Sequence, residues 1–161
     1  MKLKRIALLR SGILAAAAVT AALAIVLAGS AGAAISAHSA RTEKIQLRRT
    51  SFGKVLVDAS GFVVYRFSRD TGKKNTCLTV KECSTTWPAL TSSGQPTAGP
   101  GVNASLLSTF KLPSGQRQVT YAGHPLYYFI QDKAAGDAKG QGINGFGGLW
   151  WVMSPSGAAM H

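Results

Sequence analysis

VDASGFVVYRFSRD, residues 57–70, recurs 62 residues later as VTYAGHPLYYFIQD, residues 119–132. The two stretches share, in one order and at one spacing, a Val, a Gly, a Tyr, a Phe and an Asp. Each leads to a segment that begins with Trp, at Trp87 in the first copy and Trp150 in the second. Ordered self-similarity of this kind is the signature of a duplicated structural unit. We therefore predict one domain built from two repeats.

The shared residues are expected to build the fold, because a residue that occurs twice is a poor candidate for a single reactive centre. Gly supplies the positive φ that a tight turn needs. Aromatic residues two apart on a strand share one sheet face, and Asp caps a turn. The predicted structural set is Gly61, Tyr65, Phe67, Asp70, Trp87, Gly123, Tyr127, Phe129, Asp132 and Trp150.

β-Branched and aromatic runs on either side of each glycine predict two hairpins, over residues 54–67 and 117–130. Each Trp segment is expected to add a third strand to its own repeat. Pro88 cannot donate to a strand ladder, so Trp87 marks an edge strand or the end of a short helix over residues 80–86. The predicted fold is mainly β, a small antiparallel sheet domain of about six or seven strands. It consists of two β-meander-like repeats with pseudo-twofold symmetry and one or two short helices, one of them after Asn103.

The N-terminal residues have the layout of a secretory signal peptide. Cations between Lys2 and Arg10 precede an apolar run over residues 13–27, which gives way to small residues. Cleavage after Ala33 is the expected processing step, and a cut nearer Ala40 is the alternative.

An uncleaved anchor is a second alternative, because the stretch up to Ile35 is long enough to span a bilayer. Ser30 stands where a bacterial lipoprotein processing site requires Cys, so a lipid anchor is not expected there. The predicted organisation is a signal peptide or anchor over 1–33, a flexible tether over 34–51, the β domain over 52–157 with repeats 54–94 and 116–157, and a tail over 158–161.

The 161-residue chain has a formal net charge of +12. Removal of residues 1–33 leaves 14 Lys and Arg against 6 Asp and Glu. No module with interleaved basic and aromatic residues is recognisable, so nucleic acid is not expected as a partner. Attraction to anionic wall polymers or lipid headgroups is one interpretation, and a solvated basic surface is the other. The densest basic positions are Arg48, Arg49, Arg66, Arg69, Lys73 and Lys74.

Cys77 and Cys83 are the only cysteines, and outside the cytosol they are expected to form a disulfide. Closing so short a loop stabilises the fold by about 2 kcal/mol in the chain-entropy model. A redox pair or half of a metal site are the alternatives, but the spacing is not that of a redox motif.

Several ordered motifs resemble a bacterial family of secreted repeats, often described as lipoproteins with a Tyr-x4-Asp motif. The similarity rests on Tyr65 to Asp70, on Tyr127 to Asp132, and on the string of two cysteines followed by Trp-Pro. It extends over residues 54–157 and implies a secreted or envelope protein of the bacterial cell. The resemblance implies no activity, because the family is itself of unknown function.

Four residues are possible ligand-binding positions, namely His124, Asp137, Tyr128 and Trp151. Oxygen ligands for Ca²⁺ are available at Asp132, Asp137 and Asn144, although the spacing is not that of an EF-hand. Soft donors for copper are available at His124, Met153, Met160 and His161. No cofactor is expected, since Gly140-x-Gly142-x2-Gly145 lacks the strand and helix that a dinucleotide-binding loop requires.

The sequence favours a noncatalytic, secreted or envelope-associated β-repeat protein that serves as a binding or structural module. Its expected partner is a cell-wall polymer or an envelope protein, with membrane contact only through the N-terminal segment. A copper, calcium or redox-linked binding protein is the alternative. A hydrolase that uses Asp70 and Asp132 as a carboxylate pair is the last alternative.

Overall fold

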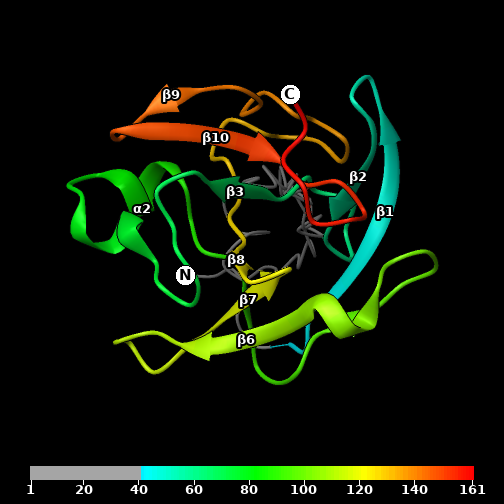
Figure 1. The fold of residues 1–161 in the computed structure, drawn as a ribbon, viewed down its shortest axis with the longest axis horizontal. Coiled ribbons are helices and arrows are strands. Elements are labelled where there is room, and N and C mark those ends of the chain that lie inside the picture. Colours follow the sequence, from blue (N-terminus) through cyan, green and yellow to red (C-terminus); the bar gives the residue numbers. More distant parts are fainter. Residues whose placement is uncertain (1–40) are drawn as a thin grey trace, which may run out of the picture.

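The computed structural model describes residues 41–161, which form a mainly β domain (Figure 1). The expected signal peptide, its cleavage sites and Ser30 lie outside the described residues. Within residues 41–161 no helix is long and apolar enough to cross a bilayer. The strands are β1 (Lys44–Thr50), β2 (Gly53–Val57), β3 (Tyr65–Phe67), β4 (Thr91–Ser92), β5 (Thr97–Ala98), β6 (Leu107–Lys111), β7 (Arg117–Tyr121), β8 (His124–Pro125), β9 (Asn144–Gly145) and β10 (Gly148–Val152). The helices are η2 (Thr76–Thr79), α2 (Cys83–Thr86) and η3 (Ala104–Leu106).

Both predicted hairpins are present. The first joins β2 to the segment that leads into β3, and the second joins β7 to β8. Gly61 and Gly123 occupy the turns with φ of 87° and 79°, the left-handed region in which a side chain is strained. In the first turn the Asp58 carboxylate accepts hydrogen bonds from the amides of Ser60 and Phe62. Local turn chemistry therefore sets both hairpins.

The third strand of each repeat pairs with the other repeat. β10, from the second repeat, runs antiparallel to β3 of the first, with Trp150 opposite Phe67 (Figure 1). The segment after Trp87 runs beside the second repeat, where Ala89 bridges Tyr127. The expectation that each Trp segment completes its own repeat is therefore wrong. Alternation of apolar and polar residues marks a strand and its faces but does not specify its partner.

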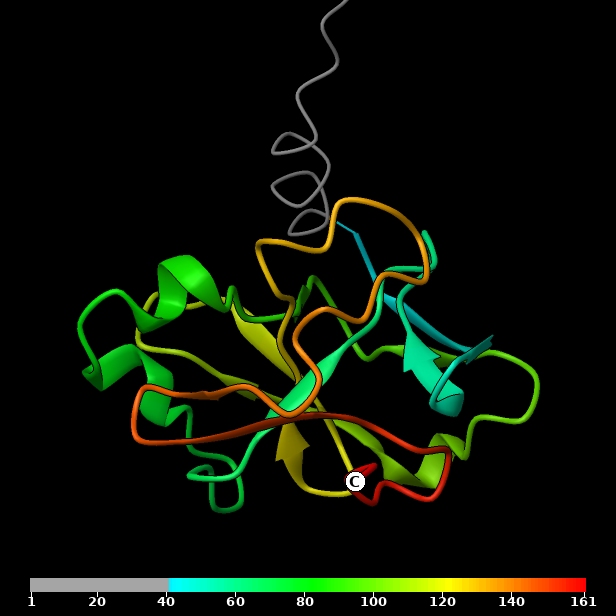
Figure 2. The same ribbon diagram turned by 90° about the horizontal axis from the view of Figure 1, so that it is seen from above.

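The two repeats meet at Tyr65 and Tyr127, which exchange both backbone hydrogen bonds at N···O distances of 2.9 Å. Equivalent residues of the two repeats therefore pair with each other. Figure 2 shows β3 crossing the middle of the molecule, with α2 to one side and the β1–β2 hairpin to the other. The mainly β fold with two symmetric repeats is confirmed.

Aromatic rings from both repeats form the centre of the core. The rings of Trp87 and Trp150 stack with centroids 3.9 Å apart and an angle of 2° between their planes. Phe67 of the first repeat stacks on Trp150 of the second, and Phe129 of the second stacks on Trp87 of the first. Each repeat therefore buries its own aromatic residues against those of the other, and the two share one core.

The opposite face of the same strands is buried as well. Val64 and Leu126, which alternate with the core tyrosines, pack in a second cluster of aliphatic and aromatic residues. Burial on both faces explains why these strands read as nearly continuous apolar runs in the sequence. The second cluster also contains Ile45, Leu56, Leu90, Val119, Tyr121, Tyr128 and Met153.

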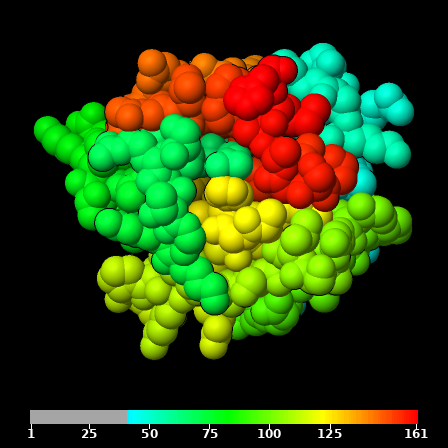
Figure 3. All heavy atoms as spheres, viewed as in Figure 1, coloured from blue at the N-terminus to red at the C-terminus, as the bar shows by residue number. Residues whose placement is uncertain are grey.

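Two segments that the sequence analysis assigned to flexible ends belong to the sheet structure. β1 lies in the expected tether but pairs with β2 and, at its first two residues, with β5. In the expected tail the Met160 amide donates to Val152, and the C-terminal residues lie against the β1–β2 hairpin (Figure 3). The described residues accordingly contain ten strands, more than the six or seven expected. The basic residues of β1 made the segment resemble a solvated tether, although its Ile45 side chain is fully buried.

Candidate functional site

The aspartates of the repeat motif hold the tyrosines of the opposite repeat. Tyr65 Oη donates to Asp132 Oδ2, and Tyr127 Oη donates to Asp70 Oδ2, both at 2.6 Å. Asp70 also accepts two hydrogen bonds from Thr76, and Asp132 accepts one from an amide of the glycine-rich loop. Each carboxylate therefore caps its own loop and links the two repeats.

The electrostatics of these pairs follow from their burial. Burial, reinforced by the bonded carboxylates, raises the pKa of Tyr65 and Tyr127 above the ordinary value of 10.0. Burial also raises the pKa of Asp132, although the hydrogen bond from Tyr65 opposes this effect. The tyrosines therefore remain hydroxyl donors throughout the physiological pH range.

This arrangement gives no support to a hydrolase. Asp70 and Asp132 are each 3% exposed, and both carboxylates are occupied by hydroxyl and amide donors. Neither lines the surface grooves of about 510, 200 and 250 Å³ that residues 41–161 form. A catalytic carboxylate must reach its substrate directly or through one water.

Cys77 and Cys83 form the predicted disulfide, with a Cα–Cα distance of 5.2 Å. The bond joins η2 to α2 at the edge of the aromatic core, and both cysteines are fully buried. The buried sulfur atoms are shielded from thiols in solution, which argues for a structural role rather than exchange chemistry.

Cations and carboxylates are separated between the surface and the interior of the domain. Residues 41–161 contain 14 Lys and Arg, and all but Arg66 are exposed. The two acids at the surface of the described domain, Glu82 and Asp137, each lie within ion-pair distance of a neighbouring lysine. The surface is therefore more cationic than the composition indicates. The buried carboxylates are Glu43, Asp58, Asp70 and Asp132.

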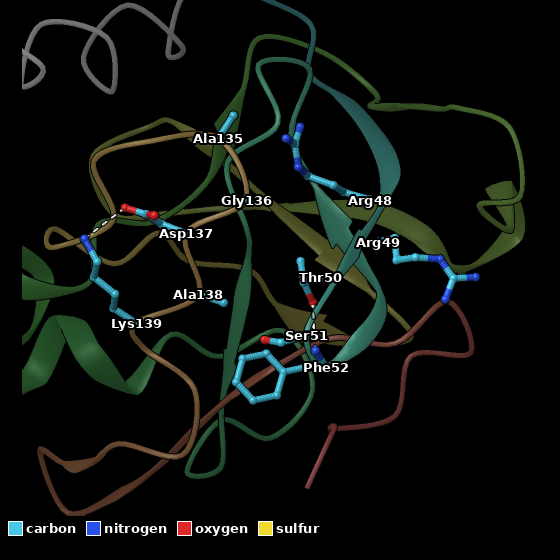
Figure 4. Close-up of a pocket in the computed structure, with 10 residues that line it drawn as sticks. All are labelled: Arg48, Arg49, Thr50, Ser51, Phe52, Ala135, Gly136, Asp137, Ala138 and Lys139. Atoms are coloured by element: carbon cyan, nitrogen blue, oxygen red, sulfur yellow. Dashed lines mark hydrogen bonds and ion pairs between the residues drawn. The ribbon is translucent and has the colours of Figure 1, made fainter.

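A groove of about 510 Å³ lies between the β1–β2 hairpin and the glycine-rich loop (Figure 4). Residues 48–52 form one wall and residues 135–139 form the other. Figure 4 shows the Arg48 side chain directed toward Gly136, whereas Arg49 points away from that loop. Phe52, which is 41% exposed, adds an apolar surface. We call this feature the Arg48 groove.

Two glycines leave room for the Arg48 guanidinium. A Cβ atom at Gly136 would lie 2.8 Å from Arg48 Nε, and one at Gly61 would lie 3.0 Å from Arg48 Nη1. A second, smaller groove of about 200 Å³ borders Arg48 on the side of Gly61. The ion pairs within residues 41–161 do not include Arg48. The guanidinium therefore lies over two glycines on an exposed residue, and its donors are available for an anion.

A family described as a secreted repeat of unknown function matches residues 47–91 and 108–154. The two matches together span more than half of the chain. The chain belongs to this family. No curated protein and no solved structure matches it significantly.

The boundaries of the secreted repeat agree with the structure. One match begins in β1 and ends in β4, and the other begins in β6 and ends just beyond β10. The β1–β2 and β6–β7 pairs are therefore equivalent, and each repeat opens with an antiparallel strand pair. The predicted resemblance is confirmed, and with it a secreted location. The repeats extend further toward the N-terminus than residues 54 and 116.

Two of the expected ligand-binding residues are engaged within the domain. Tyr128 is buried and its hydroxyl donates to Asp58 at 3.0 Å, so the expectation that it binds a ligand is wrong. Asp137 lines the Arg48 groove, where it pairs with Lys139 at 3.0 Å and accepts the Lys133 amide. The hydrogen bond from that amide is the main reason why the pKa of Asp137 is lowered.

The other two lie on separate surfaces. His124 is half-buried at the end of the second hairpin turn, and burial lowers its pKa. Trp151 is half-buried on β10 and packs edge-on against His161, with centroids 4.6 Å apart. Within residues 41–161 no three His, Cys, Asp or Glu side chains gather in a way that could hold a metal ion.

Sequence reasoning identified Arg48 as part of a dense basic pair but assigned it to the tether. A usable signal was present, because the apolar residues Ile45 and Leu47 alternate with polar ones as on a strand. The opposite wall of the groove, residues 135–139, is nearly 90 residues away in the sequence, and no local pattern connects the two.

Proposed function

We propose that the protein is a noncatalytic module of the cell envelope that binds an anionic polymer in the Arg48 groove. The observation that carries the proposal is the burial of four of the six carboxylates of residues 41–161, which leaves the exposed cations with little compensation. A surface of one sign attracts polyanions and accelerates their association.

The chemistry of the groove favours a polymer that bears phosphate or carboxylate groups. A guanidinium offers a planar pair of donors that matches both anions, and the absence of side chains at Gly61 and Gly136 leaves room for it beside the groove. The exposed Phe52 ring suits the apolar face of a sugar or glycerol unit. A groove that is open to solvent accepts a segment of a chain whose remainder continues beyond the protein.

Retention of the purified chain on immobilised polymers tests the proposal. A poly(glycerol phosphate) and a carboxylated polysaccharide are the probes, and neutral dextran is the control. We expect retention on the two anionic polymers that falls as salt rises, because salt screens exposed charges beyond about 10 Å at 0.1 M. Equal retention on dextran would contradict an electrostatic mode of binding.

Substitutions then locate the site. Arg48→Gln is expected to weaken binding about tenfold, the loss of one charge-assisted hydrogen-bonding group. Arg48→Lys keeps the charge but loses the paired donors and should be intermediate. Arg117→Gln removes the same charge from an exposed position on β7 and should have less than about a twofold effect. Equal losses for Arg48→Gln and Arg117→Gln would overturn the groove as the binding site.

A further inference from the structure

A third groove, of about 250 Å³, combines lysines with an apolar lining. It lies between the loop that carries η2 and the turn between β6 and β7, on the side of the molecule where α2 lies (Figure 1). Leu78 is 44% exposed at its edge, and Phe110 and Pro113 line it. We call Lys73, Lys74, Leu78, Phe110, Lys111 and Pro113 the lysine–leucine patch.

The backbone that carries the exposed leucine is held by hydrogen bonds and by the disulfide. Its amide donates to the Asn75 side chain at 3.1 Å, and the Asn75 amide group donates in turn to buried Gln118 at 2.8 Å. The preceding residue, Cys77, is fixed by the disulfide, and Thr76 makes two hydrogen bonds to Asp70. The buried network of the repeat motif therefore supports an apolar side chain that projects toward solvent.

The lysines around this leucine lack carboxylate partners. The ion pairs within residues 41–161 are Lys81–Glu82 and Lys139–Asp137, and neither involves the patch. No Asp or Glu lines the groove. A single exposed leucine needs no explanation. Here the exposed leucine lies beside an apolar groove and three lysines that form no ion pair within residues 41–161, so an apolar and a cationic surface adjoin each other.

We propose that the lysine–leucine patch docks the domain peripherally on an anionic lipid surface. The lysines would contact phosphate headgroups, and Leu78 and the groove would contact the apolar boundary beneath them. A soluble polyanion would contact only the lysines. The bilayer interface offers phosphate groups to the lysines and an apolar region to Leu78 and the groove. This surface is separate from the Arg48 groove, and it adds to the membrane contact that the sequence predicts only for the N-terminal segment.

A local probe tests the proposal without interference from the N-terminal segment. An environment-sensitive fluorophore is attached to a cysteine introduced by Pro113→Cys, within the patch. In a control variant it is attached through Leu149→Cys, where the native leucine is apolar and 37% exposed. The native cysteines are paired and do not react. With phosphatidylglycerol-rich vesicles we expect a blue shift and quenching by brominated lipid at position 113. No change is expected at position 149, nor at either position with phosphatidylcholine vesicles.

Substitutions in the labelled Pro113→Cys chain separate this proposal from the previous one. Replacing Lys73, Lys74 and Lys111 by Gln should abolish the shift, because each lysine near an anionic surface contributes about fivefold to partitioning. Leu78→Ser should abolish the quenching, while Arg48→Gln should preserve both signals. An unchanged probe at position 113 in anionic vesicles, or equal shifts at positions 113 and 149, would overturn the proposal. A shift with free poly(glycerol phosphate) equal to that with vesicles would also overturn it.

Discussion

The exchange of tyrosine hydroxyls between repeats can be tested by a double-mutant cycle. The perturbations are Tyr65→Phe, Asp132→Asn and the two combined. Tyr65 and Asp132 are buried and joined at 2.6 Å, the length of a charge-assisted O–H···O hydrogen bond. Such a bond to a charged group contributes about 1.5–3 kcal/mol to stability. We therefore expect a coupling free energy of that size between the two substitutions.

The matched control is a second cycle that combines Tyr65→Phe with Asp70→Asn, the aspartate of the same repeat. Asp70 bonds to Tyr127, so these two substitutions should add within about 0.5 kcal/mol. Tyr65→Phe also removes an acceptor for the Gly140 amide, but this loss is common to both cycles and cancels in the comparison.

Urea unfolding at pH 7 with the disulfide intact supplies the free energies of unfolding. The slope with denaturant must stay constant across the variants, so that a shift in midpoint reports stability alone. A larger coupling between positions 65 and 70 than between 65 and 132 would refute the exchange. It would mean that each Tyr-x4-Asp motif closes within its own repeat.

Two further predictions concern the core. Burial raises the pKa of Tyr65, Tyr127 and Tyr128 above 10.0, so their stabilising contribution is complete below pH 10 and is lost as the pH rises above it. Three such groups cost about 4 kcal/mol per pH unit. Absorbance at about 295 nm should therefore rise together with loss of the circular dichroism signal, and ionisation of these tyrosines in a folded protein would contradict this. Gly140→Ala would place a Cβ 2.7 Å from the Trp87 ring and should lower the free energy of unfolding by about 1–3 kcal/mol. Gly145→Ala, whose Cβ would meet its nearest neighbour at 3.6 Å, is the control, and equal losses in thermal melts would show that Gly140 is not constrained by the core.

The hairpins illustrate what sequence reasoning can reach. Gly61 and Gly123 mark their turns through local sequence alone, because a turn position with positive φ favours glycine regardless of the tertiary surroundings. The same is true of the disulfide, since Cys77 and Cys83 lie on one short loop. The error at β1 has the opposite cause. Its strand character depends on pairing with β2 and β5, and its basic residues resembled those of a solvated tether.

The expectation that Tyr128 binds a ligand failed for a similar reason. Tyr128 is 3% exposed, and its hydroxyl bonds to Asp58. The candidate role of Arg48 depends on its position beside Gly61 and Gly136, which belong to two separate loops. Alternation along a strand predicts which side chains share a face, but burial of that face depends on what packs against it.

The sequence by itself determined that the domain has two equivalent repeats, where each turn lies, and which aromatic residues form the core. These features are local, because glycine turns and alternating strands are encoded over fewer than about ten residues. The tertiary structure decided that Tyr65 bonds to Asp132 and Tyr127 to Asp70, and that the carboxylates lie inside while the cations lie outside. Both repeats contain the same Tyr-x4-Asp motif, so the sequence pattern is equally compatible with a Tyr–Asp bond inside each repeat and with one between the repeats. The exchanged pairing forms where both halves pack around the stacked Trp87 and Trp150 and where Tyr65 and Tyr127 pair through their backbones, contacts between residues far apart in the sequence.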